Sequence, residues 1–145
     1  MIAAAASAQF KALEVASVLP SAPVAVEAGK AVTVPLSIRI RRGYHINSET
    51  PAESYLIPTK LTWDAPGFKT AAIKYPQAEI VTYDFSDKPL SVYSGTIQIT
   101  STLTAPAEIP AGLTELSGKF RYQACNDKAC LPPRTAEFKV PVAAK

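Results

Sequence analysis

Apolar and polar residues alternate along several segments of the chain, with the two-residue period of β-strands that are buried on one face. In the clearest segment, residues 32–41, every second residue is Val, Leu or Ile, and Thr, Pro, Ser and Arg lie between them. Pro35 has no N–H group, which predicts an edge position or a bulge in this strand. Further strands are predicted over residues 9–19, 59–63, 68–74, 90–103, 113–124 and 135–142.

No segment keeps a helical period over ten residues, and no internal repeat is present. About seven to nine short strands separated by turn residues are typical of an antiparallel β-sandwich, so the fold class is predicted to be all-β. The 13 prolines are concentrated in the connections, which agrees with this prediction. Residues 76–89 have an irregular pattern and are predicted to be a long loop, and such loops tend to be functional or mobile.

Size and composition exclude several classes of protein. The 145 residues suit one domain, and 48% hydrophobic and 19% charged residues are ordinary values for a globular chain. The net charge of +3 is small, and the cluster Arg39, Arg41 and Arg42 is interpreted as a solvated strand end. Nucleic acid is therefore not expected as a partner. No apolar run approaches the ~18 residues of a membrane span, so no transmembrane segment is expected.

The first nine residues are rich in alanine and have the small-residue character of a signal-peptide cleavage region. They lack the basic start and the full apolar stretch of a complete signal. Residues 1–9 are therefore either the remnant of an export signal or a disordered N-terminus, and residues 10–145 are predicted to form the single domain. Two cysteines at hairpin spacing also suit an oxidising compartment.

Cys125 and Cys130 are the only cysteines, and alternating segments lie on both sides of them. These segments predict a hairpin in which residues 126–129 form a loop of turn-forming residues. Facing residues of an antiparallel pair have Cα atoms about 4.5 to 5.5 Å apart, within the range of a disulfide. Alternation places Cys125 on the face opposite Phe120 and Tyr122, so the sulfurs should point away from the core and need other groups to shield them.

The bridge could be redox-active or only structural. A ring of about six residues restrains the unfolded chain by only roughly 2 kcal/mol, against about 4 for a bridge across most of a domain. This favours redox use, but a non-catalytic protein-binding module with an inert hairpin disulfide remains the alternative. Lys128 in the loop, with Arg121 and Arg134 beside it, would help a thiolate only modestly. The exchange would therefore depend on a reactive thiol from a partner.

Other site chemistries fit less well. Zinc takes four ligands, or three and a water molecule, and two cysteines with the distant His45 make a poor set, so no metal and no cofactor is predicted. A Cys–His hydrolase would leave one cysteine unexplained. His45 by itself is interpreted as a strand-end residue packed beside Tyr44.

The residues around the cysteines carry a family likeness. Tyr122-Gln123-Ala124-Cys125, four loop residues and Cys130-Leu131-Pro132-Pro133 resemble the N-terminal periplasmic domain of the thiol:disulfide interchange protein DsbD. A Gly43-Tyr44 turn after a long strand and Tyr93 in mid-chain extend the likeness over residues 15–142. The resemblance implies an immunoglobulin-like domain in the periplasm.

The resemblance also implies a function. The cysteine pair would receive electrons from a membrane-embedded reductase domain and pass them to exported thioredoxin-fold proteins, namely disulfide isomerases and cytochrome c maturation factors. Cys130 would form the mixed disulfide with the partner, and Cys125 would resolve it.

The resemblance further implies a loop with an aromatic residue that covers the disulfide. Residues 76–89 are the candidate for this cap, with Tyr83 or Phe85 as the shielding ring, and Tyr44, His45 and Asn47 match a turn beside the active site.

Three departures from the family pattern stand out. The loop between the cysteines is one residue shorter than in the best-known member, and His45 and Asn47 replace aromatic residues. No membrane domain follows Lys145 in this sequence, so both an excised domain and a standalone protein with a separate electron donor remain open.

Overall fold

The computed structural model describes residues 14–143, so the predicted export signal or disordered segment at residues 1–9 lies outside the described part. The described residues form eleven strands and no helix, hence none that could cross a membrane. The strands are β1 (Ala16–Val18), β2 (Ala31–Ile40), β3 (His45–Asn47), β4 (Lys60–Trp63), β5 (Lys69–Lys74), β6 (Glu79–Val81), β7 (Leu90–Tyr93), β8 (Thr96–Thr104), β9 (Glu115–Tyr122), β10 (Ala124–Cys125) and β11 (Arg134–Pro141).

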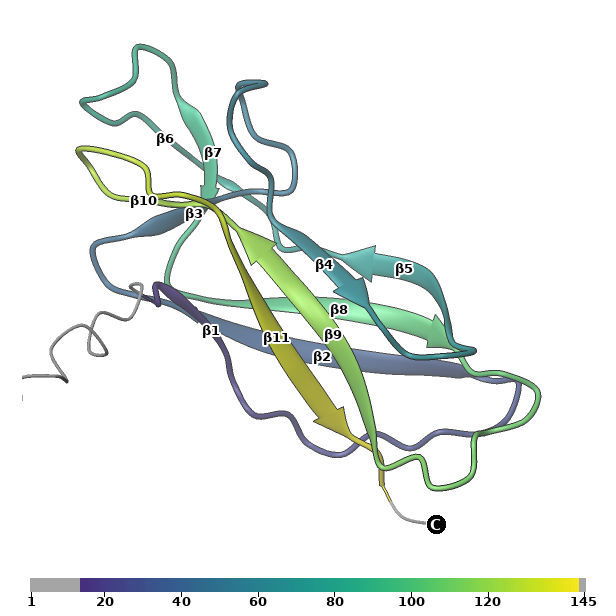
Figure 1. Ribbon diagram of the computed structural model, residues 1–145. Coiled ribbons are helices and arrows are strands. Elements are labelled where there is room, and N and C mark those ends of the chain that lie inside the picture. Colours follow the sequence, from purple (N-terminus) through teal and green to yellow (C-terminus); the bar gives the residue numbers. More distant parts are fainter. Residues whose placement is uncertain (1–13, 144–145) are drawn as a thin grey trace, which may run out of the picture.

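The strands form three antiparallel sheets, and the all-β prediction is confirmed. Their orders are β1-β2-β8-β5, β11-β9-β4 and β10-β3-β7-β6. The first two sheets form an immunoglobulin-like sandwich, and the third lies at one end of it, where β10, β3, β7 and β6 meet (Figure 1). The third sheet contains both the strand with Cys125 and the long loops of that end.

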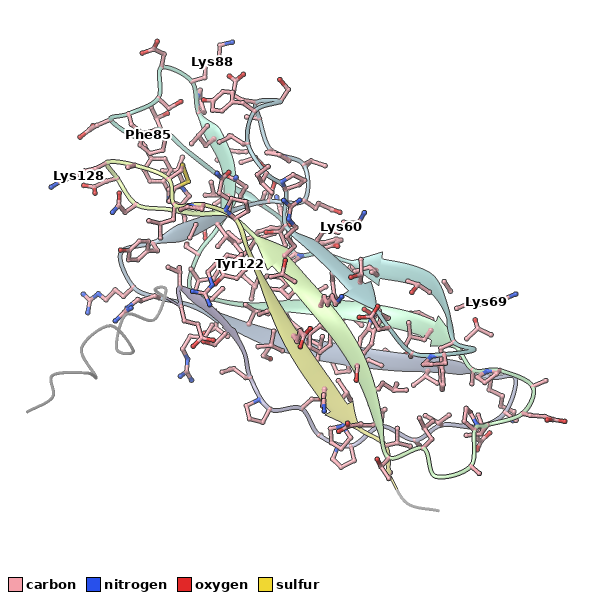
Figure 2. All side chains as sticks on the ribbon, viewed as in Figure 1. Lys60, Lys69, Phe85, Lys88, Tyr122 and Lys128 are labelled. Carbon is pink, nitrogen blue, oxygen red and sulfur yellow. A yellow bond between two sulfur atoms is a disulfide. The ribbon has the colours of Figure 1, made fainter. Side chains whose placement is uncertain are left out.

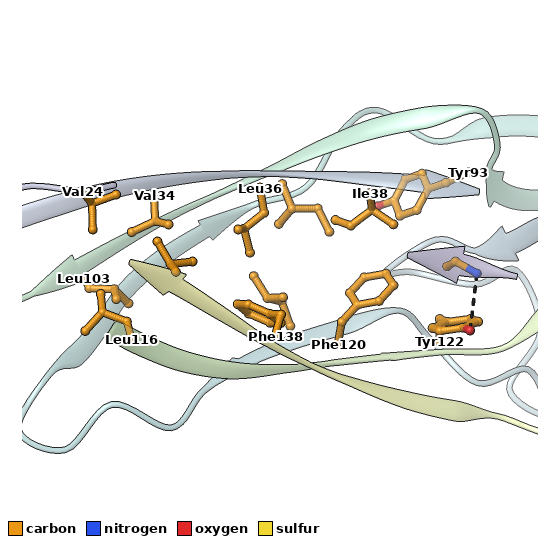
Figure 3. Close-up of a cluster of buried hydrophobic side chains, with 14 of the residues drawn as sticks. Val24, Val34, Leu36, Ile38, Tyr93, Leu103, Leu116, Phe120, Tyr122 and Phe138 are labelled. Carbon is orange, nitrogen blue, oxygen red and sulfur yellow. Dashed lines mark hydrogen bonds between the residues drawn. The ribbon is translucent and has the colours of Figure 1, made fainter. Parts of the chain in front are cut away.

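The core lies between β2 and the β9–β11 pair (Figure 3). The predicted alternation of β2 is confirmed, because every second residue of this strand is buried, from Val32 to Ile40. Phe120 and Tyr122 of β9 face them and stack on one another with ring centroids 5.5 Å apart. The Tyr122 hydroxyl accepts a hydrogen bond of 3.4 Å from the Ala16 N–H, which ties β1 to the opposite sheet (Figure 3).

Pro35 is on an inner strand by sheet order, but it is locally at an edge. β1 pairs only with the last three residues of β2 and ends well before Pro35. The Leu19 N–H donates to the Ser37 carbonyl, so the backbone groups of Ser37 point to the β1 side of the strand. Pro35 lies two residues earlier, so its backbone nitrogen points to the same side. The missing N–H of Pro35 therefore costs no ladder hydrogen bond.

Two segments differ from the sequence prediction. Residues 90–103 are not one strand, because Gly95, with a φ of 73°, separates β7 in the third sheet from β8 in the first. Residues 76–89 are not all loop, because they contain the edge strand β6. The count of seven to nine strands was too low since strands of two or three residues, such as β3, β6 and β10, are too short to show a period.

Gly118 marks a tight position in the three-stranded sheet. It pairs with Trp63 on one side and Phe138 on the other, and these rings meet edge to face over it with centroids 5.1 Å apart. A Cβ atom at Gly118 would overlap the Phe138 ring and approach the Thr62 carbonyl oxygen to 2.7 Å. Gly118 does not have a positive φ, so its backbone conformation does not require glycine. The close contact of the aromatic rings across the strands requires it instead.

We expect Gly118→Ala to lower the free energy of unfolding by about 1–3 kcal/mol, the usual cost of adding a methyl group to a packed core. Urea unfolding followed by tryptophan fluorescence measures it. Lys119→Ala, on the exposed side of the same strand, is the control and should change stability by no more than about 0.5 kcal/mol. An unchanged midpoint for Gly118→Ala would contradict the tight fit.

Candidate functional site

The two cysteines form a disulfide at the tip of a hairpin. β9 and β11 pair from Tyr122↔Arg134 onward, and beyond them Cys125 and Cys130 form an isolated antiparallel bridge. Their Cα atoms are 3.9 Å apart, closer than the predicted distance, and their sulfurs are bonded. The predicted disulfide is confirmed. Cys125 lies in β10, whereas Cys130 lies outside the named strands.

Asn126 organises the loop between the cysteines. Its Oδ1 accepts hydrogen bonds from the N–H groups of Lys128 and Ala129, at 2.8 and 2.9 Å, and its own N–H donates to the Ala129 carbonyl at 2.9 Å. An asparagine side chain that bonds to backbone two residues further on is a frequent way of closing a short turn. The loop is thereby held in the shape that brings the two sulfurs together.

The third sheet presents two different faces. Ala124 pairs with Ile46, and Ile46 pairs with Tyr93; these three residues belong to the main core. The neighbouring pair Cys125↔His45 points to the opposite face, because successive residues of a strand alternate. Cys125 therefore faces away from the main core, as the alternation predicted.

Two loops cover this second face. Leu56 of the β3–β4 loop (residues 48–59) packs with Leu90 and Val92 of β7, and Tyr83 of the β6–β7 loop packs against them. Both loops rise at the same end of the molecule as the β10 hairpin (Figure 1). Cys125 is completely buried as a result, while Cys130 is only half-buried. The two cysteines of one disulfide thus differ in accessibility.

An aromatic stack lies beside the disulfide. The ring of Tyr83 stacks on His45 with centroids 4.2 Å apart, and Phe85 stacks on Tyr83 at 5.7 Å. Phe85, the outer ring, is 36% exposed and lies in the loop above the hairpin tip (Figure 2). The stack therefore runs from the sheet neighbour of Cys125 to the surface. We call residues 82–89, which contain Tyr83 and Phe85, the cap loop.

His45 and Asn47 share the face of Cys125 and are both buried. His45 Nε2 and Asn47 Oδ1 have no hydrogen-bond partner, and they are the two buried side-chain polar atoms of the described residues in that condition. Burial lowers the pKa of His45, so the imidazole is neutral near neutral pH. Burial, and secondarily Glu79, raises the pKa of the adjacent Tyr83.

Gln123 is a site residue that the sequence reasoning did not single out. Its Oε1 accepts hydrogen bonds from Asn47 Nδ2 and the Ile57 N–H, both at 3.0 Å, and its Nε2 donates to the Leu131 carbonyl at 3.4 Å. One side chain thus joins β3, the β3–β4 loop and the segment after Cys130. The signal in the sequence was a polar residue directly before Ala124-Cys125, two small apolar residues that the structure shows to be buried.

The remaining predicted residues, Tyr44 and Lys128, are not members of this stack. Tyr44 is half-buried and packs against the main core. Lys128 is exposed in the hairpin loop, and its side chain points outward (Figure 2). The described residues contain no group of three or more His, Cys, Asp or Glu side chains that could hold a metal ion.

A family model for the N-terminal domain of the thiol:disulfide interchange protein DsbD matches residues 14–141. The chain belongs to this family. Its fold is also similar to that of two solved structures. One is the reduced DsbD N-terminal domain of Neisseria meningitidis, at 20% sequence identity and a TM-score of 0.52, with 83% of each chain covered. The other is the N-terminal periplasmic domain of ScsB from Proteus mirabilis.

The ScsB match has 11% identity and a TM-score of 0.54, and it covers 82% of this chain and 43% of that one. At these identities the two structures establish the fold of this DsbD N-terminal family member, and its family membership comes from the model match. None of the curated proteins matches the sequence. The resemblance stated from the cysteine motif is confirmed.

We expect Asn126→Ala to make the disulfide easier to reduce, because the loop would lose the two hydrogen bonds that hold the cysteines together. A loss of about 1.4 kcal/mol raises the reduction potential by roughly 30 mV for a two-electron couple, so the shift should be of that order or less. Equilibration with glutathione buffers measures it. Asn126→Asp keeps the acceptor oxygen and is the matched control; an equal shift in both variants would contradict the explanation.

Proposed function

We propose that this domain relays electrons by thiol–disulfide exchange through the Cys125–Cys130 couple. The observation that carries the proposal is the unequal burial of the two cysteines at one covered end of a DsbD N-terminal family domain. A membrane-embedded reductase domain would reduce the disulfide. The dithiol would then reduce exported thioredoxin-fold proteins such as disulfide isomerases and cytochrome c maturation factors. The periplasm is the proposed location, since the ScsB domain of the same fold is periplasmic.

The burial of the cysteines supports separate roles for them. The half-buried Cys130 would attack the disulfide of an oxidised partner, forming one mixed disulfide and releasing one partner thiolate. The buried Cys125 would then attack the Cys130 sulfur, which restores the internal disulfide and releases the second partner thiolate. The partner gains two electrons and the domain loses two.

The trapping experiment tests these roles. We expect Cys125→Ser to accumulate a mixed disulfide with an oxidised thioredoxin-fold partner, because Cys130 can attack but nothing resolves the adduct. Cys130→Ser should form little adduct, since its remaining thiol is buried. Non-reducing gel electrophoresis with mass spectrometry measures both. Equal trapping would overturn the roles, and no trapping together with a potential below about −300 mV would indicate an inert structural bridge.

The cap loop is proposed to shield the disulfide from small thiols. Tyr83 stacks on His45, the sheet partner of Cys125, and Phe85 covers Tyr83 from outside. An ion pair of 3.7 Å between the exposed Lys88 and the partly buried Glu53 joins the cap loop to the β3–β4 loop, and surface pairs of this kind contribute little. A partner could therefore displace the cap loop without unfolding the sheet beneath it.

We expect Tyr83→Ala combined with Phe85→Ala to speed reduction of the disulfide by glutathione, because the stack above His45 would be lost. Stopped-flow measurement of the reduction rate tests this. Ile80→Ala is the control: Ile80 lies in β6, outside the cap loop, and is 68% exposed, so its removal should leave the rate unchanged. An unchanged rate in the double variant would mean that the shield lies elsewhere.

A further inference from the structure

The proposed exchange requires a proton transfer that the two cysteines cannot provide. In the resolving step Cys125 must attack as a thiolate, yet its side chain is completely buried. Burial disfavours a thiolate, and Lys128, the cation of the hairpin loop, is exposed. A group on the same side of the sheet must therefore accept the Cys125 proton as the new disulfide forms.

His45 is placed to accept it. It is the registered partner of Cys125 in the β10–β3 pair, and the side chains of paired residues lie on one face with Cβ atoms about 4.5 to 5.5 Å apart. His45 is 3% exposed, and its Nε2 has no hydrogen-bond partner while the cysteines are oxidised. A buried nitrogen without a hydrogen bond destabilises the fold. The unpaired nitrogen belongs to the residue paired with Cys125, whose sulfur has no proton in the disulfide and gains one on reduction.

We propose that His45 is the proton acceptor for Cys125 in the resolving step, which rests on the exchange function proposed above. The imidazole takes the proton from the Cys125 thiol, and the thiolate attacks the Cys130 sulfur of the mixed disulfide. The Cys125–Cys130 bond forms, the bond from Cys130 to the partner breaks, and the partner leaves as a thiolate. The proton on His45 then passes to that thiolate or to water, so no further reactant is needed.

The surroundings of His45 suit this role. The titratable groups packed near it are Cys125 and Cys130 of the hairpin and Tyr83 of the cap loop, with Glu79 of β6 acting on Tyr83. Burial lowers the pKa of His45, which keeps the imidazole neutral and able to accept a proton at neutral pH. The stack with Tyr83 fixes the plane of the ring.

The attack by Cys130 and the resolution by Cys125 can be followed separately with dithiobis(nitrobenzoate), an aromatic disulfide whose released thiolate is coloured. Reduced wild-type protein releases one equivalent when Cys130 attacks and a second when Cys125 closes the internal disulfide. His45→Phe keeps a ring for the Tyr83 stack but has no nitrogen. We expect it to slow the second release at least about tenfold near neutral pH and to leave the first release unchanged.

The pH profile separates proton transfer from a structural effect. In His45→Phe the second release should rise about tenfold per pH unit, because it depends on spontaneous ionisation of Cys125, whereas the wild-type rate should stay nearly constant above the pKa of His45. The two rates should converge at high pH. His45→Gln should show the same pH profile as His45→Phe, although it loses the ring.

Other results would overturn the inference. A second release that is equally fast in wild type and His45→Phe, or slower by the same factor at every pH, would exclude proton transfer by His45. A wild-type protein that forms the adduct but releases no second equivalent would overturn the exchange function as well, because Cys125 would then not resolve the adduct.

Discussion

The pairing of the two-residue strand β10 with β3 is the constraint on which the site depends. The chain runs in one sheet up to Tyr122 and joins another at Ala124, so Cys125 is fixed in a sheet whose two faces are both covered. Gln123 stabilises this crossing, because its side chain bonds to β3, to the β3–β4 loop and to the segment after Cys130. Without the pairing, Cys125 would be part of an exposed hairpin tip and equivalent to Cys130.

The disulfide is not what holds the fold together. It closes a ring of about six residues, which restrains the unfolded chain by only roughly 2 kcal/mol. The core between β2 and the β9–β11 pair lies outside this ring, and the register of β9 with β11 begins before it. The scaffold can therefore persist when the bond is broken. A couple that cycles between disulfide and dithiol needs this independence, whereas a structural staple would gain most by joining distant strands.

The sequence predicted the long strands, in which the two-residue alternation continues over many residues. The alternation in β2, β9 and β11 gave their buried faces and the hairpin, and the spacing of the cysteines gave the bridge. It could not give the third sheet, because strands of two to four residues show no period, and β3 pairs with residues far away in the chain on both of its sides. The placing of Tyr44 with His45 and Asn47 came from the family resemblance, and in the structure Tyr44 packs against the main core. The role of Gln123 depends on three backbone segments that only the folded chain brings together.

The face of the third sheet that carries Cys125 contains more buried polar groups than stability alone requires. A dry compartment designed only for stability would be lined with apolar residues, as Leu56, Leu90 and Val92 line part of it. Here the same face carries a buried histidine and a buried asparagine, each with one unpaired polar atom. Each such atom costs about 1–3 kcal/mol. Both of these costs occur on one face of β3, within two residues of the strand position paired with Cys125. The unpaired groups thus gather at the disulfide, which is the arrangement expected of a face that serves the proposed chemistry of the sulfurs at the expense of stability.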